Sequence, residues 1–316
     1  MNRINPETAM QAPCQSPLRV WLTAVRPFAY TASVLTVALG AAMAHDAGYP
    51  LQWGALALTL IGVVCFHTAG NLLNDCFDHR RGLDTEVLPM SGAVVRGWLS
   101  ERQVFRGAML CLSVGILCGL ALVAIAGWVV LLLGIAGAVC ALGYTTPRFC
   151  FKYAGLGDLA IFLAFGVLPV FGTWWVQTRT FAWLPLLWSL PLVLPTVGIL
   201  HGNNWRDIEN DGTLGCKTVA GHLGSAGSRV YYQSQVLGPF VLVAVLAVLG
   251  QIPRLALPTP PHTFIAFLAL PLALKLARIR PEADPQAFAM LDGKTAQLHL
   301  LFGILVTLAF AFGRGV

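Results

Sequence analysis

Charged residues are scarce in this sequence. Asp, Glu, Lys and Arg make up 11% of the 316 residues, against about 25% in soluble globular domains, and 57% of the residues are hydrophobic. The eight cysteines never form a C-x-x-C pair, so neither a zinc site nor a disulfide framework is indicated. No basic segment with a small-residue cleavage site precedes the first apolar run, so we expect no removable signal peptide. These features predict an integral membrane protein.

Long apolar segments fill most of the chain. A membrane-spanning helix needs ~20 mostly apolar residues, and nine segments qualify: roughly 28–45, 53–74, 105–123, 125–143, 156–176, 184–204, 231–250, 262–279 and 295–313. Their length favours helices over barrel strands of alternating polarity. We therefore expect an all-α membrane protein, a bundle of about nine transmembrane helices around a central cavity. Residues 1–20 are expected to form a polar N-terminal tail, and residues 21–316 a single transmembrane domain.

The basic residues are distributed unevenly between the predicted loops. With the N-terminus in the cytoplasm, every Lys and Arg except Arg179, Arg254 and Arg314 falls on the cytoplasmic side. This is the bias expected from the positive-inside rule, so the net charge of +6 indicates topology and gives no reason to expect a nucleic-acid partner. The C-terminus is then outside.

An acidic motif lies at the end of the second predicted span. It reads Asn71-Leu72-Leu73-Asn74-Asp75-Cys76-Phe77-Asp78. In a helix, Asn71, Asp75 and Asp78 stand at i, i+4 and i+7 and share one face. Carboxylates at the end of a membrane helix are costly and usually functional.

A second acidic motif follows the sixth predicted span. It reads Asn203-Asn204-Trp205-Arg206-Asp207-Ile208-Glu209-Asn210-Asp211. Asn203, Asp207 and Asp211 stand at i, i+4 and i+8, again on one face if the segment is helical. Carboxylate pairs facing each other across a cavity would repel unless cations lay between them, and hard oxygen ligands select Mg²⁺. Since Mg²⁺ in proteins commonly shares its ligands with substrate phosphates, the motifs predict a diphosphate substrate at the cytoplasmic side. For either motif alone, a solvated loop is an equally good interpretation.

Basic residues on the same side could bind the phosphate oxygens. The candidates are Arg81 in the long loop after the first motif, Arg148 and Lys152 after the fourth span, and Lys217 after the second motif. They could equally be topology determinants. His67 and His201 lie one turn before each motif, and we assign neither a catalytic role, because buried, hydrogen-bonded histidines are the commoner case.

With these residues in hand, the chain resembles the UbiA superfamily of intramembrane prenyltransferases, from Arg26-Pro27 to Gly224. Asn74-Asp75-Cys76-Phe77-Asp78 is similar to the family's first motif, and Asp207 and Asp211 to its second. Where many members have a third aspartate four residues after Asp78, this chain has Gly82, with Asp84 two residues later. The second motif, Gly215-Cys216-Lys217-Thr218 and Gly155-Leu156-Gly157-Asp158 are similar to the 1,4-dihydroxy-2-naphthoate polyprenyltransferases of menaquinone synthesis.

The resemblance implies Mg²⁺-dependent transfer of a polyprenyl chain from its diphosphate to a small aromatic acceptor. Asp75, Asp78, Asp207 and Asp211 would be the catalytic metal ligands. The expected diphosphate-binding residues are Asn71, Asn74, Asn203, Arg81, Arg148, Lys152 and Lys217. With 1,4-dihydroxy-2-naphthoate as acceptor, the reaction loses CO₂ and gives demethylmenaquinone. Arg26 is a candidate for binding the acceptor's carboxylate.

Two kinds of alternative stay open at this point. The acceptor could be 4-hydroxybenzoate, homogentisate, a chlorophyll precursor or haem. A cation-coupled membrane transporter, a different class of protein, can also carry paired motifs in two halves. The absence of a transit peptide predicts a bacterial cytoplasmic, or inner, membrane.

Overall fold

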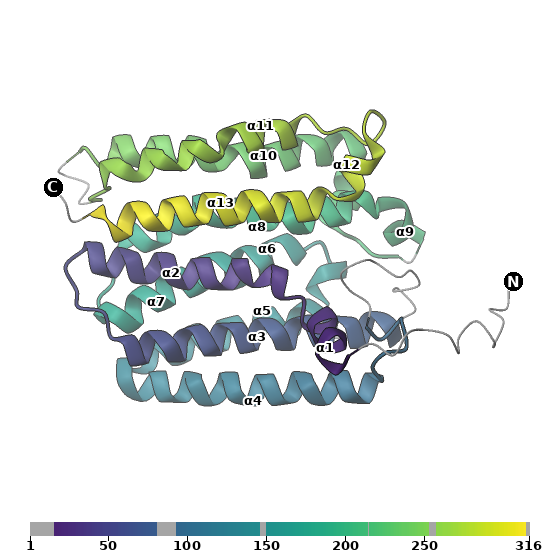
Figure 1. Cartoon of the computed structure of the whole chain (residues 1–316), viewed down its shortest axis with the longest axis horizontal. Coiled ribbons are helices and arrows are strands. Elements are labelled where there is room, and N and C mark those ends of the chain that lie inside the picture. Colours follow the sequence, from purple (N-terminus) through teal and green to yellow (C-terminus); the bar gives the residue numbers. More distant parts are fainter. Residues whose placement is uncertain (1–15, 81–92, 146–149, 214, 253–256, 314–316) are drawn as a thin grey trace, which may run out of the picture.

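The computed structural model describes residues 16–80, 93–145, 150–213, 215–252 and 257–313, which form a bundle of long helices lying side by side (Figure 1). The described residues contain no strand, only an isolated bridge between Ala154 and Lys217. The all-α prediction is therefore confirmed.

Within the described ranges, seven helical segments are long and apolar enough to cross a membrane. Five of them are single helices: α3 (Trp53–Arg80), α4 (Glu101–Ala126), α8 (Trp183–Arg206), α10 (Val219–Leu249) and α13 (Leu291–Ala311). A sixth consists of the 3-10 turn Pro27–Tyr30 and α2 (Thr31–Asp46). The seventh runs through α6 (Gly157–Phe162), a π-helical turn (Leu163–Val167) and α7 (Leu168–Thr178). Two shorter apolar segments are α5 (Trp128–Thr145) and the pair formed by the 3-10 helix Pro261–Ala269 and α11 (Leu270–Ala277). These elements coincide with the nine predicted segments, although which of them cross the bilayer stays a prediction.

Short elements connect or precede the long helices. They are α1 (Pro17–Val25), a 3-10 turn (Phe151–Tyr153), α9 (Ile208–Thr213) and α12 (Pro285–Ala289). Helix α1 includes the predicted boundary at residue 20, and its Val20 and Ala24 are buried. The assignment of residues 21–316 to a single domain stays a prediction.

Local sequence signals set several helix ends. Ser100 and Gln103 form a capping box that begins α4, each side chain bonding the other residue's backbone N–H. Gly127, with φ of 87°, ends α4 and lets the chain reverse into α5. Helix α3 extends six residues past the predicted end at 74, so the whole first motif lies on a helix.

The centre of the bundle is formed by α13, which packs against both α2 and α8. Buried aromatic and aliphatic side chains fill this contact; Trp188 of α8 meets Phe310 of α13 edge to face, with ring centroids 5.0 Å apart. Helices α3, α4 and α5 lie to one side of this centre, leaving α3 between α4 and the rest of the bundle (Figure 1).

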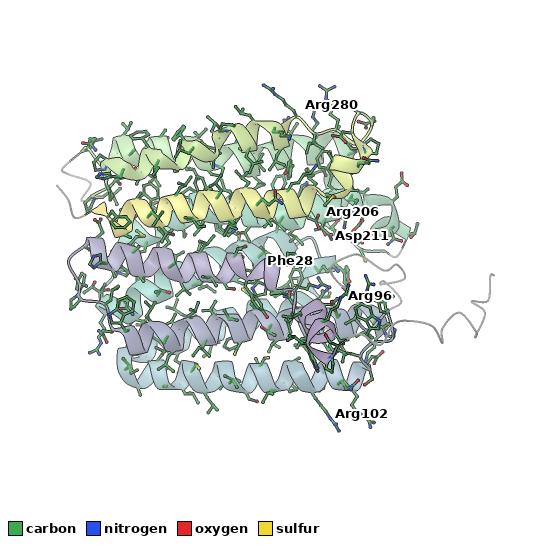
Figure 2. All side chains as sticks on the ribbon, viewed as in Figure 1. Phe28, Arg96, Arg102, Arg206, Asp211 and Arg280 are labelled. Carbon is green, nitrogen blue, oxygen red and sulfur yellow. The ribbon has the colours of Figure 1, made fainter. Side chains whose placement is uncertain are left out.

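Charged side chains gather at one end of the bundle. Arg96, Arg102, Arg206, Asp211 and Arg280 all lie at the end that carries α9 and α12 (Figure 2). Both acidic motifs are at this same end.

Candidate active site

A cavity of about 430 Å³ lies inside the bundle beside α3. It follows α3 from Thr59 to Asn74, a distance of about 22 Å at 1.5 Å per residue. Most of its wall is apolar, contributed by α3, α4, α5, α7 and α8. Its polar lining residues include Arg26, Asn71, Asn74, Lys152, Asn203 and Asp292. The predicted central cavity is thus present, and residues of both motifs line it.

The first motif projects from one face of α3, as its spacing predicts. Asn71 and Asn74 line the cavity, and Asp75 and Asp78 are buried, with exposed fractions of 1% and 2%. Asn71 Nδ2 donates to the Val25 carbonyl at 3.2 Å, which ties α3 to α1. The buried Asn74 Oδ1 has no hydrogen-bond partner among the described residues.

Each carboxylate of the first motif is held by a cation from elsewhere in the chain. Arg26 forms an ion pair with Asp75. Lys152 Nζ lies 2.8 Å from Asp78 Oδ2, and the Tyr153 hydroxyl donates to Asp78 Oδ1 at 2.6 Å. Burial opposes the charge on Lys152, but the Asp78 carboxylate, with smaller contributions from Tyr153 and Tyr144, raises the Lys152 pKa well above its usual range. Lys152 is therefore charged and lies against the motif.

The second motif starts on α8 but does not continue as one helix. Helix α8 ends at Arg206, Asp207 caps it with φ and ψ of −98° and 13°, and α9 begins at Ile208. The prediction that the segment from Asn203 to Asp211 is one continuous helix is therefore wrong. A backbone bond from Asp211 N–H to the Asp207 carbonyl, 2.8 Å long, keeps the two acidic residues one turn apart nonetheless.

Electrostatics connect the two motifs. Burial raises the pKa of the Asp211 carboxyl to about 6; Lys152 opposes the shift, while Asp207 and Asp78 add to it. Asp211 therefore interacts with the first motif's Asp78 and with the lysine that binds it. No three His, Cys, Asp or Glu side chains within the described ranges stand close enough to form a metal-binding group. The ligand set of four aspartates stays a prediction.

Arg206 and Asp292 complete the second motif's surroundings, and the sequence interpretation gave them no role. The Arg206 guanidinium bonds Asp207 Oδ1 at 3.0 Å and also contacts Asn203 and the Ala289 carbonyl. Asp292 Oδ2, at the start of α13, lies 3.7 Å from Arg206 Nη1. An acidic residue at the beginning of a predicted span is the signal that could have pointed to Asp292.

Within the described residues, the structure gives no side-chain contact with the motifs for the other predicted phosphate-binding cations. Lys217 has an exposed side chain, and its backbone N–H bonds the Tyr153 carbonyl at 3.2 Å, so the second motif's loop lies beside the Lys152 turn. Arg81, Asp84 and Arg148 lie outside the described residues. His201 is fully buried, 3.7 Å from Asp158, and does not line the cavity.

Comparison with known proteins decides the family. The model of the UbiA prenyltransferase family matches residues 33–312. The UbiA prenyltransferase domain-containing protein 1 of Mus musculus is 33% identical over 301 residues, covering 95% of this chain and 84% of the mouse protein. The chain belongs to the UbiA prenyltransferase family. A Drosophila melanogaster homologue of the mouse protein is 30% identical to this UbiA protein, over 92% of this chain and 79% of its own length.

Solved structures share the UbiA fold. A UbiA homologue from Aeropyrum pernix K1 matches with a TM-score of 0.66 and 16% identity, covering 90% of this chain and 97% of that one. A homologue from Archaeoglobus fulgidus, solved bound to GPP and Mg²⁺, matches with a TM-score of 0.61 and 16% identity, covering 91% and 99%. This UbiA protein is accordingly a membrane-embedded prenyltransferase, and the transporter alternative loses its support.

Proposed function

We propose that this UbiA protein transfers a polyprenyl chain from polyprenyl diphosphate to an aromatic acceptor in a Mg²⁺-dependent reaction. The observation that carries the proposal is the cavity. Its apolar length along α3 suits a prenyl chain, and its polar lining includes asparagines of both acidic motifs, Asn71, Asn74 and Asn203, together with Lys152. The Archaeoglobus fulgidus homologues solved with DMAPP or GPP and Mg²⁺ support the same substrate class.

The first motif offers the kind of oxygen ligands that Mg²⁺ prefers. Asp75 and Asp78 offer buried carboxylate oxygens, and the buried Asn74 Oδ1 is a hard oxygen donor with no partner among the described residues. The influence of Asp78 and Lys152 on the pKa of the Asp211 carboxyl supports a site that both motifs share. We infer that Asp75, Asp78, Asp207 and Asp211 hold Mg²⁺, with Asn71, Asn74 and Asn203 orienting the ligands. When bound, Mg²⁺ neutralises negative charge on the diphosphate.

The protein's own cations would act on the same leaving group. Lys152 is charged, lies at the cavity and contacts Asp78, so it can stabilise the charge that develops as the allylic C–O bond breaks. Lys217, Arg81 and Arg148 stay proposed phosphate contacts. The apolar cavity wall excludes water from the allylic carbon, which favours attack by an electron-rich ring.

For the acceptor, we propose 1,4-dihydroxy-2-naphthoate, with replacement of its carboxylate by the prenyl chain and loss of CO₂, giving demethylmenaquinol, the hydroquinone form of demethylmenaquinone. The support is the similarity of the second motif and of residues 155–158 to the 1,4-dihydroxy-2-naphthoate polyprenyltransferases. Arg26, at the cavity beside Asp75, could bind the acceptor's carboxylate. The relatives described above are UbiA prenyltransferase domain-containing proteins 1 and do not settle the acceptor.

The proposed orientation is based on the distribution of charge. Both motifs and the arginines of Figure 2 share one end of the bundle, which we propose faces the cytoplasm, with the C-terminus outside. A bacterial cytoplasmic membrane stays a prediction, since the relatives described above are animal proteins.

The test is a product assay with purified protein, polyprenyl diphosphate and competing aromatic acceptors. We expect a magnesium-dependent product that contains the prenyl chain and lacks the naphthoate's carboxylate, identified by mass. Product formed only with 4-hydroxybenzoate or homogentisate would keep the reaction class and replace the acceptor. Asp75→Ala and Asp207→Ala should each abolish turnover without preventing membrane insertion; near-normal turnover in either variant would contradict the metal-site assignment.

A further inference from the structure

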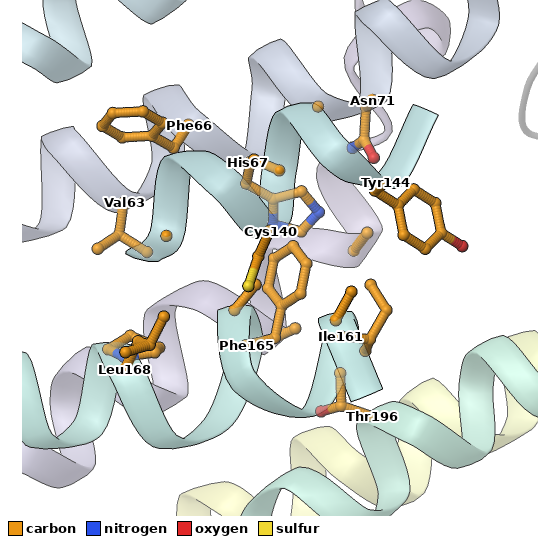
Figure 3. A pocket seen from close by; sticks show the side chains of 18 of the residues that line it. Val63, Phe66, His67, Asn71, Cys140, Tyr144, Ile161, Phe165, Leu168 and Thr196 are labelled. Carbon is orange, nitrogen blue, oxygen red and sulfur yellow. The ribbon is translucent and has the colours of Figure 1, made fainter. Parts of the chain in front are cut away.

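His67 continues the functional face of α3 into the cavity. It precedes Asn71 by four residues, one helical turn, so it lies on the same face but about 6 Å further from the acidic end. Of the histidines in the described part of the chain, His67 alone lines the cavity. Figure 3 shows its imidazole in the cavity wall, with Asn71 and Phe165 nearby. A ring hydroxyl bound beside His67 would therefore lie next to the place where the diphosphate end is expected.

The imidazole is held in one orientation. Its Nδ1 atom is 2.8 Å from Ser33 Oγ on α2, and its ring packs edge to face against Phe165 and Tyr30, with centroids 4.5 and 5.4 Å away. No described residue bonds the other ring nitrogen, Nε2. In the tautomer in which Nδ1–H donates to Ser33, the Nε2 lone pair is left to accept a proton.

The Phe165 side of this arrangement is locally unusual. Phe165 is at the centre of the π-helical turn Leu163–Val167, between α6 and α7. Such turns are rare and occur frequently at functional sites because they re-aim side chains. Gly166 keeps the turn against α8, since a Cβ there would lie 2.4 Å from Val193. The turn thus places an aromatic ring against His67 in the wall of the cavity.

We propose that His67 Nε2 accepts the hydroxyl proton of the aromatic acceptor and acts as the general base of prenyl transfer, with Ser33 as its positioning residue and Phe165 packing beside the acceptor ring. The proposal rests on the proposed function and names a catalytic group for it. It assigns the acceptor a chemical class, a hydroxylated aromatic ring.

The step balances as follows. The hydroxyl proton moves to Nε2 while the ring carbon uses its π electrons to form a bond with the allylic carbon. The allylic C–O bond breaks, and its electron pair leaves with diphosphate. The ring, now a ketone at the hydroxyl position, regains aromaticity when CO₂ departs and leaves its electron pair behind. The resulting phenolate takes the proton back from His67.

The experiment combines turnover with acceptor binding. His67→Asn keeps an amide near the Nδ1 position, within reach of Ser33, and removes Nε2. His67→Gln restores a polar atom near the Nε2 position without restoring a base. The matched control is His299→Gln, which changes another buried imidazole, one that does not line the cavity. Binding of 1,4-dihydroxy-2-naphthoate and of its dimethyl ether, which has no hydroxyl proton, is measured by calorimetry.

We expect His67→Asn to lower kcat on the order of 10²-fold, the lower end for a lost general base, with an unchanged KM for prenyl diphosphate. The wild-type protein should bind the dihydroxy compound roughly fivefold to tenfold more tightly than the ether, as one hydrogen bond provides. His67→Asn should erase this preference, His67→Gln should restore the preference but not kcat, and His299→Gln should change neither.

Three results would overturn the proposal for His67: turnover of His67→Asn within threefold of wild type, an intact binding preference in that variant, or equal losses for prenyl diphosphate and acceptor, which would indicate a structural role. Absence of turnover in the wild-type protein would instead refute the proposed function. The binding preference and its loss in His67→Asn would then still decide whether His67 recognises the hydroxyl.

Discussion

The buried pair of Lys152 and Asp78 provides a quantitative test of the site's electrostatics. The carboxylate is 3% exposed and the lysine side chain 19%, with 2.8 Å between Nζ and Oδ2. Removing one partner of a buried ion pair costs about 3–5 kcal/mol because the other charge is left unpaired. Without the lysine, Asp78 would still accept the hydrogen bond from the Tyr153 hydroxyl, and the lysine side chain is one-fifth exposed. We therefore expect Lys152→Met to lower the free energy of unfolding by roughly 2–3 kcal/mol.

A double-mutant cycle isolates this interaction. Unfolding by SDS in mixed micelles, followed by tryptophan fluorescence, would be measured for Lys152→Met, Asp78→Asn and the double variant. We expect a coupling of at least ~1.5 kcal/mol, because the double variant leaves no unpaired charge. Tyr153→Phe, which removes a neutral donor to the same carboxylate, is the control and should cost about 1.5 kcal/mol. Additive effects, or a loss below ~0.5 kcal/mol for Lys152→Met, would show that the pair does not stabilise the site.

Three further predictions concern individual positions. Lys217→Ala should raise the KM for prenyl diphosphate several-fold with little change in kcat; unchanged kinetics would reduce this exposed lysine to a topology signal. Asp292→Asn should lower kcat/KM through loss of its ion pair near the second motif, while the unfolding free energy, measured in the same micelles, stays within about 0.5 kcal/mol, as for other partly exposed pairs. Gly166→Ala should cost about 1–3 kcal/mol of stability by forcing a Cβ against Val193, and Val193→Ala in the same chain should recover part of that loss. The control Gly134→Ala, whose added Cβ would meet no atom outside its own helix within 4 Å, should not destabilise the protein.

Much of the fold follows from apolar segment length alone. The nine predicted segments coincide with helices because each long apolar stretch must satisfy its backbone hydrogen bonds internally. The ends are harder to predict. Helix α3 runs to Arg80, six residues beyond the end of the apolar segment. Asp75 and Asp78 in this extension are paired with Arg26 and Lys152 from distant segments, and these ion pairs stabilise helical turns that the polar sequence alone does not predict.

The candidate site was predictable where the relevant residues share one helix. Periodicity places Asn71, Asp75 and Asp78 on one face of α3, and the structure agrees. Spacing gave no indication of the break at Asp207, where the Arg206 guanidinium bonds the capping carboxylate.

Contacts between distant segments were not visible in the sequence. Arg26, His67 and Asp292 reach the cavity from three different helices or turns, and only packing of those elements brings them together. His67 illustrates the difficulty. A buried histidine in a membrane helix has no pattern of its own, and its possible role becomes apparent only from Ser33 on one side and the cavity on the other.

The central claim is that residues of both motifs form one magnesium-dependent site for prenyl diphosphate. The most direct measurement is binding of a non-hydrolysable prenyl diphosphate analogue to purified wild type, Asp78→Asn and Asp211→Asn, each with and without Mg²⁺. The account predicts that the wild-type protein binds the analogue tightly only when Mg²⁺ is present. In either variant, binding should be weak and should no longer depend on Mg²⁺. Binding that is equally tight without Mg²⁺, or that depends on one motif alone, would contradict it.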